Sequence, residues 1–316
     1  TEGGMQKTKV VHLTIVHKRY DSRIFCKECI SLSEAGYDVS LIVADGLGNE
    51  TKQGVKIIDV GRAEASRIKR MIRTSRKAVD LALGMNADIY HFHDPDLLIE
   101  ALRLRKKACV IFDSHEDFPA LMKQRDYIPD FARKVLFRLC TLIEKYSAKR
   151  LSAVVCATET IQDKFARYGN IKAVVVKNYP VFSSCESETT NSYDTMKPVC
   201  YVGGLTALRG VKEMVEACNK AGVKLLLAGE FDNQAYLEQI KAMPEWRNVE
   251  FLGYVPTSQV REKVYNRSSV GLVLLHKAPN HTHSIPIKQL EYMQAGLPVV
   301  ASREVEFCKQ VTEAEN

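Results

Sequence analysis

A glycine-rich turn begins directly after the apolar run 199–202 and ends in Arg209 and Gly210. Gly203 and Gly204 would let the backbone come close to a phosphate, and the helix pattern that follows would direct free N–H groups toward it. The Arg209 guanidinium could hold a diphosphate with two parallel hydrogen bonds. The turn therefore predicts a diphosphate cradle, although tight strand-to-helix turns also use glycine for structural reasons alone.

A second cluster of candidate residues lies at 283–302. Ser284 and Pro286 are helix-start residues, and Gly296 is a stop signal before an apolar strand. Lys288 and Glu291 are three residues apart on this short helix, so they share a face near the ends of the strands. The pair could belong to a ligand site, or it could be a surface ion pair without a further role.

The elements that must position these clusters repeat along the whole chain. Short apolar runs rich in β-branched residues alternate with helical stretches, and continuous apolar strands indicate parallel sheets that helices cover on both faces. In the helix after the first strand, Phe25, Cys29 and Leu32 share one face and Gly36 ends it. The expected strands are 10–16, 39–43, 55–60, 88–93, 108–113, 153–157 and 173–176, then 199–202, 223–228, 249–252, 270–275 and 297–301.

This alternation predicts two Rossmann-like, doubly wound α/β domains that face a cleft. We assign residues 5–180 to the first domain and 198–316 to the second. Residues 181–197 are rich in Ser, Thr, Glu and Asn and read as a linker.

The composition is that of a globular protein, with 316 residues, 46% hydrophobic and 26% charged. The nine cysteines are scattered, which indicates reduced thiols in a reducing cytosol, and no cluster has the spacing of a metal site. Residues 1–180 have 31 Lys+Arg against 22 Asp+Glu, whereas the remainder has 14 against 16. The basic half suggests that one domain meets a polyanion or an anionic membrane.

The two clusters and their order resemble the donor-binding domain of the retaining family-four glycosyltransferases, which have the GT-B fold. The resemblance is closest to their bacterial capsule and lipopolysaccharide branch. It rests on the glycine-rich turn and on the run Ser-x-Pro-x-Lys-x-x-Glu-Tyr-Met-x-x-Gly-x-Pro-Val-Val-Ala-Ser at 284–302. The first half agrees at 20–25, 91–96, 112–116 and 176–180, so the match spans almost the whole chain.

The resemblance implies roles for the matching residues. Glu291 would hold the donor ribose hydroxyls, Arg209 the diphosphate, and His115 would lie near the sugar and the acceptor; these three are the catalytic candidates. The donor-binding candidates are Gly203, Gly204, Arg209, Ser284, Ile285, Pro286, Ile287, Lys288 and Glu291. The acceptor-binding candidates are Asp21, Arg23, His93, Asp94 and Glu116; His91 reads as a core residue of its strand, and so could His93.

Three features depart from the family pattern. Gly204 stands where most members have an arginine, and His283 stands where the first glutamate of a paired signature is usual. The family also continues beyond residue 301 with further βα units, so we expect the C-terminal domain to be truncated.

Asp94-Pro95-Asp96 mimics the Asp-x-Asp metal motif of the other glycosyltransferase fold, but the proline and the different fold argue for a chance match.

Residues 66–83 form a candidate membrane-binding helix. Ile68, Ile72, Val79 and Leu83 lie on one stripe, and the basic residues of its first turns include Arg70, Arg73 and Lys77. This basic face could simply be solvated, or it could bind an anionic membrane that carries a lipid-linked acceptor. The patch has no interleaved aromatic residues, so we do not expect it to bind nucleic acid.

We therefore expect a cytoplasmic glycosyltransferase, peripheral to the membrane or free of it, that needs no metal ion or other cofactor. It would move a sugar from a nucleotide-sugar donor, with UDP-sugars favoured, to a glycan or lipid-linked glycan with retention. Two alternatives stay open: a nucleotide-sugar epimerase or hydrolase of the same fold, and a non-catalytic donor-binding subunit.

Overall fold

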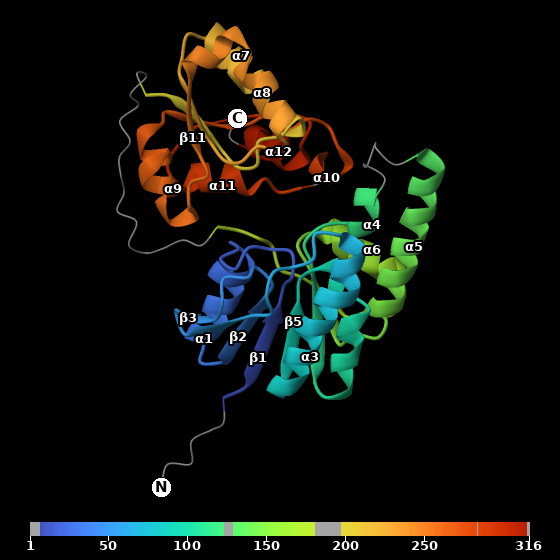
Figure 1. Cartoon of the computed structure of the whole chain (residues 1–316). Coiled ribbons are helices and arrows are strands. Elements are labelled where there is room, and N and C mark those ends of the chain that lie inside the picture. Colours follow the sequence, from blue (N-terminus) through green and yellow to red (C-terminus); the bar gives the residue numbers. More distant parts are fainter. Residues whose placement is uncertain (1–6, 123–128, 181–196, 283, 315–316) are drawn as a thin grey trace. The chain divides into compact units, whose positions relative to one another are not determined.

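The computed structural model describes residues 7–122, 129–180, 197–282 and 284–314. The chain divides into two compact units, one that ends at Asn178 and one that begins at Tyr179. In Figure 1 the colours of the first unit run from blue to yellow-green and those of the second from yellow to red. The predicted linker falls almost entirely outside the described residues, as does His283.

The N-terminal unit is built on an eight-stranded sheet in the order β3-β4-β2-β1-β5-β6-β7-β8. Neighbouring strands are parallel except for β3, which runs antiparallel to β4. The strands are β1 (Lys9–Leu13), β2 (Asp38–Val43), β3 (Glu50–Lys52), β4 (Val55–Asp59), β5 (Ile89–Phe92), β6 (Cys109–Ser114), β7 (Ala153–Cys156) and β8 (Ala173–Val175). All seven expected strands are present with small changes at their ends. The sequence did not predict β3, because its three residues are mostly exposed and polar.

Helices cover both faces of this sheet (Figure 1). On one face Phe25 and Cys29 pack against Leu41 and Ile57, with Leu32 partly buried beside them, so the predicted helical face is confirmed. On the other face a larger core includes Val79 and Phe92. The helices are η1 (Ile24–Cys29), α1 (Ile30–Glu34), α2 (Arg67–Lys69), η2 (Arg70–Thr74), α3 (Ser75–Met85), η3 (Pro95–Leu97), η4 (Glu100–Lys106), α4 (Phe118–Leu121), α5 (Asp130–Ala148) and α6 (Glu159–Arg167).

The expected apolar stripe at 66–83 is wrong in its first half. Ile68 and Ile72 are 71% and 61% exposed, whereas Val79 is buried and Leu83 packs on the core. The physical reason is η2, a π-helical turn between α2 and α3, whose wider spacing turns the first residues away from the face that α3 buries.

The C-terminal unit contains a parallel five-stranded sheet in the order β11-β10-β9-β12-β13. Its strands are β9 (Val199–Val202), β10 (Leu225–Ala228), β11 (Val249–Gly253), β12 (Val270–Val273) and β13 (Val299–Ala301), so all five expected strands are present. Its helices are η6 (Ala207–Arg209), α7 (Val211–Lys220), α8 (Gln234–Lys241), η7 (Pro244–Asn248), α9 (Thr257–Lys263), η8 (Tyr265–Arg267), α10 (Pro279–Thr282), α11 (Ile287–Gln294) and α12 (Glu306–Ala314).

Separate cores lie on the two faces of this sheet as well. Met214 of α7 packs with Leu225 on one face, and Tyr292 of α11 packs with Leu226 on the other. Helix α11 begins after Pro286 and ends before Gly296, whose φ of 72° is in the left-handed region, so the predicted start and stop are confirmed. Two Rossmann-like α/β units thus confirm the predicted fold class. Among the described helices, none is long and apolar enough to span a membrane.

Candidate functional site

Both sheets have a point where the strand order reverses, and in each the reversal lies next to the first strand of the unit. From β9 the chain continues to β10 and β11 on one side, and then returns to β12 and β13 on the other. In the N-terminal unit the corresponding point lies between β1 and β5. In open parallel sheets, ligands bind beyond the carboxyl ends of the strands at such a point.

The glycine-rich turn leaves the carboxyl end of β9 at this reversal. A side chain at Gly210 would bring its Cβ within 2.2 Å of the Leu274 carbonyl oxygen, and one at Gly203 would lie 2.9 Å from the Tyr201 hydroxyl. Packing alone therefore requires glycine at these two positions, whether or not a phosphate binds there. The sequence had left this structural explanation open. Gly204 is exposed, and the atoms nearest to a Cβ there belong to the Arg209 guanidinium, at 3.9 Å.

Arg209 is half-buried and folds back over its own turn, with Nη1 3.2 Å from the place of a Gly203 Cβ. The loops after β9 and β12 are joined here, since the His276 amide donates a hydrogen bond to the Leu208 carbonyl oxygen at 2.9 Å. The cation is thus placed beside a backbone that carries little side-chain bulk, as a diphosphate cradle requires.

Glu291 lies on α11, which is anchored to β9. The buried hydroxyl of Tyr292 accepts a hydrogen bond from the Val202 amide at 3.1 Å, and the Tyr292 ring fills the space that a Cβ at Gly271 would occupy, 2.4 Å away. The neighbouring Glu291 is therefore held at the same edge of the sheet as the glycine-rich turn.

The Glu291 carboxylate has two donors, and both contact Oε2. The Tyr265 hydroxyl and Lys288 Nζ are each 2.6 Å from this oxygen, and the side chains of Glu291 and Lys288 are 22% and 28% exposed. Burial raises the pKa of Tyr265, and the Glu291 charge raises it further, so the hydroxyl remains a donor. The predicted Lys288–Glu291 pair is real and partly buried, and Tyr265 is a partner that the sequence did not reveal.

Ser284, Ile285 and Pro286, which directly precede α11, are half-buried. The Ser284 hydroxyl donates to the His281 carbonyl oxygen at 2.9 Å, and Ile287 and Lys288 open the first turn of α11 after Ile285 and Pro286. Amides in a first turn have no partner within their helix. This segment follows β12, so it belongs to the same switch point.

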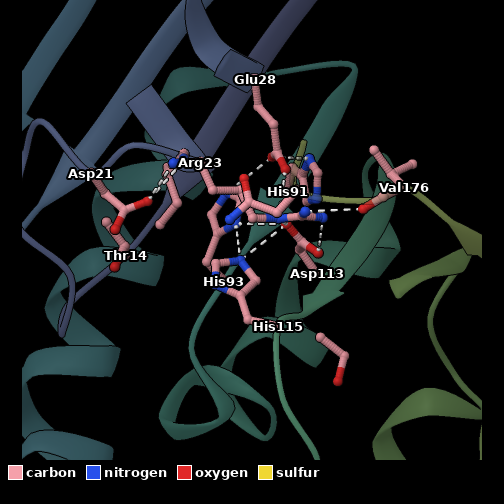
Figure 2. A network of polar contacts seen from close by, with 12 residues as sticks. Thr14, Asp21, Arg23, Glu28, His91, His93, Asp113, His115 and Val176 are labelled. Carbon is pink, nitrogen blue, oxygen red and sulfur yellow. Dashed lines mark hydrogen bonds and ion pairs between the residues drawn. The ribbon is translucent and has the colours of Figure 1, made fainter. Parts of the chain in front are cut away.

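In the N-terminal unit, a buried polar network lies under η1 at the corresponding switch point (Figure 2). Arg23 donates to both carboxylate oxygens of Asp113, from Nε at 2.8 Å and from Nη2 at 2.9 Å, and to the Val176 carbonyl oxygen at 2.9 Å. Arg23 is 4% exposed and Asp113 is fully buried. Burial alone would raise the pKa of Asp113, but hydrogen bonds from His115, His93 and Arg23 hold it well below its ordinary value.

The histidines of this network surround Asp113. His115 Nε2 lies 3.0 Å and His93 Nδ1 lies 3.3 Å from Asp113 Oδ2. On its other side His93 Nε2 contacts His12 Nδ1 at 2.9 Å. Burial and neighbouring histidines lower the pKa of both His91 and His93 to about 3, so both rings are neutral.

The predicted acceptor residues differ in their accessibility. Asp94 is buried and accepts hydrogen bonds from the Thr14 hydroxyl and the Ile15 amide, while Asp21 accepts from the amides of Arg23 and Ile24. His93 is also buried, and Arg23 is committed to Asp113. Glu116 is exposed, and the side chains of Asp21 and His115 are 25% and 19% exposed, so these three are the most accessible of the predicted residues beside the network.

The predicted membrane residues also differ. Arg70 and Arg67 both bind the buried carboxylate of Asp96, at 2.8 and 3.1 Å. The interpretation of Arg70 as a membrane contact is therefore corrected, because its charge is already compensated inside the unit. Arg73 and Lys77 are exposed.

Because Asp96 binds arginines and Asp94 binds Thr14, the Asp-x-Asp sequence does not present two available carboxylates.

Comparisons with known proteins identify both units. Residues 27–178 match the family model described as Glycosyltransferase Family 4, and residues 197–316 match the one described as Glycosyl transferases group 1. The chain is a glycosyltransferase with the GT-B fold. Among the curated proteins, none matches it.

Solved structures that resemble this glycosyltransferase share its fold at low sequence identity. WaaG, a glycosyltransferase involved in lipopolysaccharide biosynthesis, has a TM-score of 0.70 and 12% identity over 97% of this chain and 84% of WaaG. Anabaena HepE in complex with UDP-glucose has a TM-score of 0.66 and 13% identity, over 96% of this chain and 82% of HepE. Sucrose-phosphate synthase from Thermosynechococcus elongatus has a TM-score of 0.66 and 15% identity, over 94% of this chain and 82% of the synthase.

Proposed function

We propose that this glycosyltransferase moves a sugar from a nucleotide-sugar donor to a glycan or lipid-linked glycan, with retention of the anomeric configuration. The observation that carries the proposal is the switch point of the C-terminal sheet, where the Arg209 turn follows β9 and the Glu291 helix follows the adjacent β12. UDP-sugars are favoured as donors, since HepE structures contain UDP or UDP-glucose. The likeness to WaaG, which is involved in lipopolysaccharide biosynthesis, supports a role in that process. We propose that the protein acts there or in capsule biosynthesis, in the cytoplasm.

The donor would be held from two sides. Glu291 Oε2 is occupied by Tyr265 and Lys288, so Oε1 offers an acceptor for the ribose hydroxyls. The Arg209 guanidinium and the amides of the first turn of α11 would contact the diphosphate and neutralise it as it leaves. This charge supply is the reason that we propose a donor step without a metal ion.

The N-terminal unit would supply the acceptor side. His115 and Glu116 follow β6 and are accessible, so they are the residues that we propose to touch the sugar or acceptor. Arg23, His93 and Asp94 are buried in contacts with other side chains, and Asp21 binds two backbone amides. We propose that these four position the loops around His115 rather than bind the acceptor themselves.

A nucleoside diphosphate is expected to raise the melting temperature of the protein in the presence of EDTA. A ligand that binds only the folded state stabilises it by RT ln(1 + [L]/Kd), which is about 2.7 kcal/mol at a hundredfold excess over Kd. Differential scanning fluorimetry with UDP, GDP, ADP and dTDP measures the shift and ranks the bases. A shift that appears only after Mg²⁺ or Mn²⁺ is added would contradict the metal-independent donor step.

We further propose that the N-terminal unit binds an anionic membrane. Exposed Ile68 and Ile72 lie beside exposed Arg73 and Lys77, and apolar residues flanked by cations are typical of membrane-surface helices. Helix α5 adds a further exposed apolar stripe at a spacing of three to four residues: Phe131, Val135, Leu139, Leu142 and Tyr146.

Charge reversal should test this membrane surface. Arg73→Glu with Lys77→Glu is expected to weaken cosedimentation with phosphatidylglycerol vesicles by about tenfold or more, since each basic residue near such a membrane contributes about 1 kcal/mol. Lys52→Glu with Lys56→Glu, at two exposed side chains of strands β3 and β4, is the charge-matched control. Equal losses in both variants would show a nonspecific charge effect, and no binding of wild type at low salt would rule the surface out.

A further inference from the structure

Four ionisable side chains meet on one face of the N-terminal sheet. His12 of β1 and His91 of β5 are partners in the strand register, and His93 follows on the same face. Glu28 reaches this cluster from η1, above the sheet (Figure 2). One ligand atom from each of the four residues lies within 4.8 Å of the others.

The distances within the cluster are short. His12 Nδ1 and His93 Nε2 are 2.9 Å apart, and Glu28 Oε2 is 3.9 Å from both His93 Nε2 and His91 Nδ1. The side chains of His12 and His93 are fully buried, while those of His91 and Glu28 are 12% and 15% exposed. Nitrogen and oxygen atoms therefore converge on one small, nearly closed space.

The hydrogen-bonding capacity of the cluster is not satisfied by the described part of the chain. Both carboxylate oxygens of Glu28 are buried without a hydrogen-bond partner among those residues. The same holds for Nε2 of His12 and of His91, the second ring nitrogens of the two histidines whose Nδ1 atoms face His93 and Glu28. Arg23 Nε lies 3.1 Å from Glu28 Oε1 but directs its hydrogen to Asp113. Since Arg23 already neutralises Asp113, a Glu28 carboxylate has no cation of its own.

We propose that His12, Glu28, His91 and His93 bind one divalent transition-metal ion, with Zn²⁺ the best fit. Three imidazoles and one carboxylate form a set that Zn²⁺ accepts, and closed four-coordinate sites are structural rather than catalytic. The ion would supply the positive charge that Glu28 lacks. It would also tie η1 to β1 and β5 at the switch point, directly behind His115.

The protonation states suit this role. Burial lowers the pKa of His12, His91 and His93, so their rings are neutral and each has a nitrogen lone pair. Asp113 stands behind His93 on the Nδ1 side, at 3.3 Å, and orients the ring so that Nε2 faces the cluster. Asp113 itself is not a ligand in the proposal, because Arg23 and the histidines occupy its oxygens.

The ligand atoms, which all lie within 4.8 Å of one another, would have to adjust to the spacing of a tetrahedral site. Zn–N and Zn–O bonds of about 2.0–2.1 Å place tetrahedral ligand atoms ~3.3 Å apart. The His12–His93 distance of 2.9 Å and the two Glu28 distances of 3.9 Å bracket this value. Glu28 lies on a π-helical turn, and its backbone amide donates an i to i+5 hydrogen bond of 3.0 Å to the Arg23 carbonyl oxygen. Arg23 and Glu28 therefore share the helix face that points at the sheet.

The test measures metal binding by the whole chain, produced without a histidine tag. After dialysis against metal-depleted buffer, one equivalent of Co²⁺ is added, and wild type is expected to show the visible absorption bands of tetrahedral Co²⁺. Plasma mass spectrometry should then find one Zn²⁺ per chain after Zn²⁺ exchange, and Zn²⁺ should raise the melting temperature.

The Glu28→Gln variant keeps the shape of the side chain but removes the anionic ligand, so its Zn²⁺ affinity should fall by about tenfold or more in a competition titration with a chromophoric chelator. His276→Asn, at a 45% exposed histidine of the C-terminal unit, should bind as wild type does. If Glu28→Gln fails to fold, the wild-type Co²⁺ spectrum still decides.

A wild-type protein that gives no Co²⁺ bands and no Zn²⁺-dependent melting shift would overturn the proposal. Glu28 would then keep a proton instead, since burial and the Asp113 charge raise its pKa to about 9. Retained affinity in Glu28→Gln would equally overturn it. Donor binding in EDTA is measured separately in the C-terminal unit, so failure of the metal site is distinguishable from failure of the proposed function.

Discussion

Replacing Asp113 with alanine is expected to lower the free energy of unfolding of the N-terminal unit by about 3–5 kcal/mol. The reason is that Arg23, which is 4% exposed, would be left as a buried cation without its carboxylate, and His93 and His115 would lose their common partner. Removal of one member of a buried ion pair costs more than the pair contributes, because the remaining charge stays desolvated.

Hydrogen exchange read by mass spectrometry measures this loss in the full chain. Exchange of the β5 and β6 segments should become at least about a hundredfold faster in Asp113→Ala. The single tryptophan, Trp246, lies in the C-terminal unit, so its fluorescence transition in urea is an internal control that should not move. Asp80→Ala is the matched control, since its pair with Arg103 is on the surface, with Asp80 52% exposed, and should cost at most about 1 kcal/mol. Equal exchange in both variants would contradict the account of the network.

The same carboxylate gives the network a pH dependence. Because the folded-state pKa of Asp113 lies well below its ordinary value of 3.8, its contribution to stability is present above that value and is lost as the pH falls through the folded pKa. The difference in stability between wild type and Asp113→Asn should persist from neutral pH to about pH 4 and shrink below it.

The C-terminal unit is the part of the molecule that the sequence predicts best. The strands next to Gly203 and next to α11 are continuous apolar runs. Helix start and stop residues lie close to the ends of the observed helices. A linear motif is sufficient to predict this region, because the turns that position Arg209 and Glu291 are formed by residues close to each of them in the sequence. Tyr265 and Tyr201 were missed, since each reaches the site through a contact that sequence spacing does not encode.

The polar network of the N-terminal unit could not be predicted in the same way. His12 and His93 are 81 residues apart in the sequence and become neighbours only through the pairing of β1 with β5. Glu28 reaches them because η1 is π-helical, a departure from the 3.6-residue period on which sequence patterns are read. A partial signal existed in Asp113, a carboxylate at the end of an otherwise apolar strand. The second π-helical turn, η2, caused the error at Ile68 and Ile72 for the same reason.

Replacing Glu291 with alanine is expected to weaken binding of the nucleotide donor by at least about tenfold. Loss of the acceptor for the ribose hydroxyls would leave buried donors unpaired, at a cost of roughly 1–3 kcal/mol, and more with a charged acceptor. Glu291→Gln keeps the shape and one acceptor oxygen, so its affinity should lie between those of wild type and Glu291→Ala. Glu250→Ala, which removes an exposed ion pair with Arg267 in the same unit, should bind as wild type does.

Calorimetric titration of UDP into wild type, both Glu291 variants and Glu250→Ala, in EDTA and with melting curves alongside, is the most direct test of the donor site. We expect the affinity of Glu291→Ala for UDP to fall by about tenfold or more while the protein remains folded. If Glu291 were only the structural partner of Lys288 and Tyr265, its loss would lower stability by about 1–3 kcal/mol, because the buried Tyr265 hydroxyl would lose its acceptor, and UDP binding would stay as it is. Unchanged affinity in Glu291→Ala would therefore contradict the assignment of the donor site.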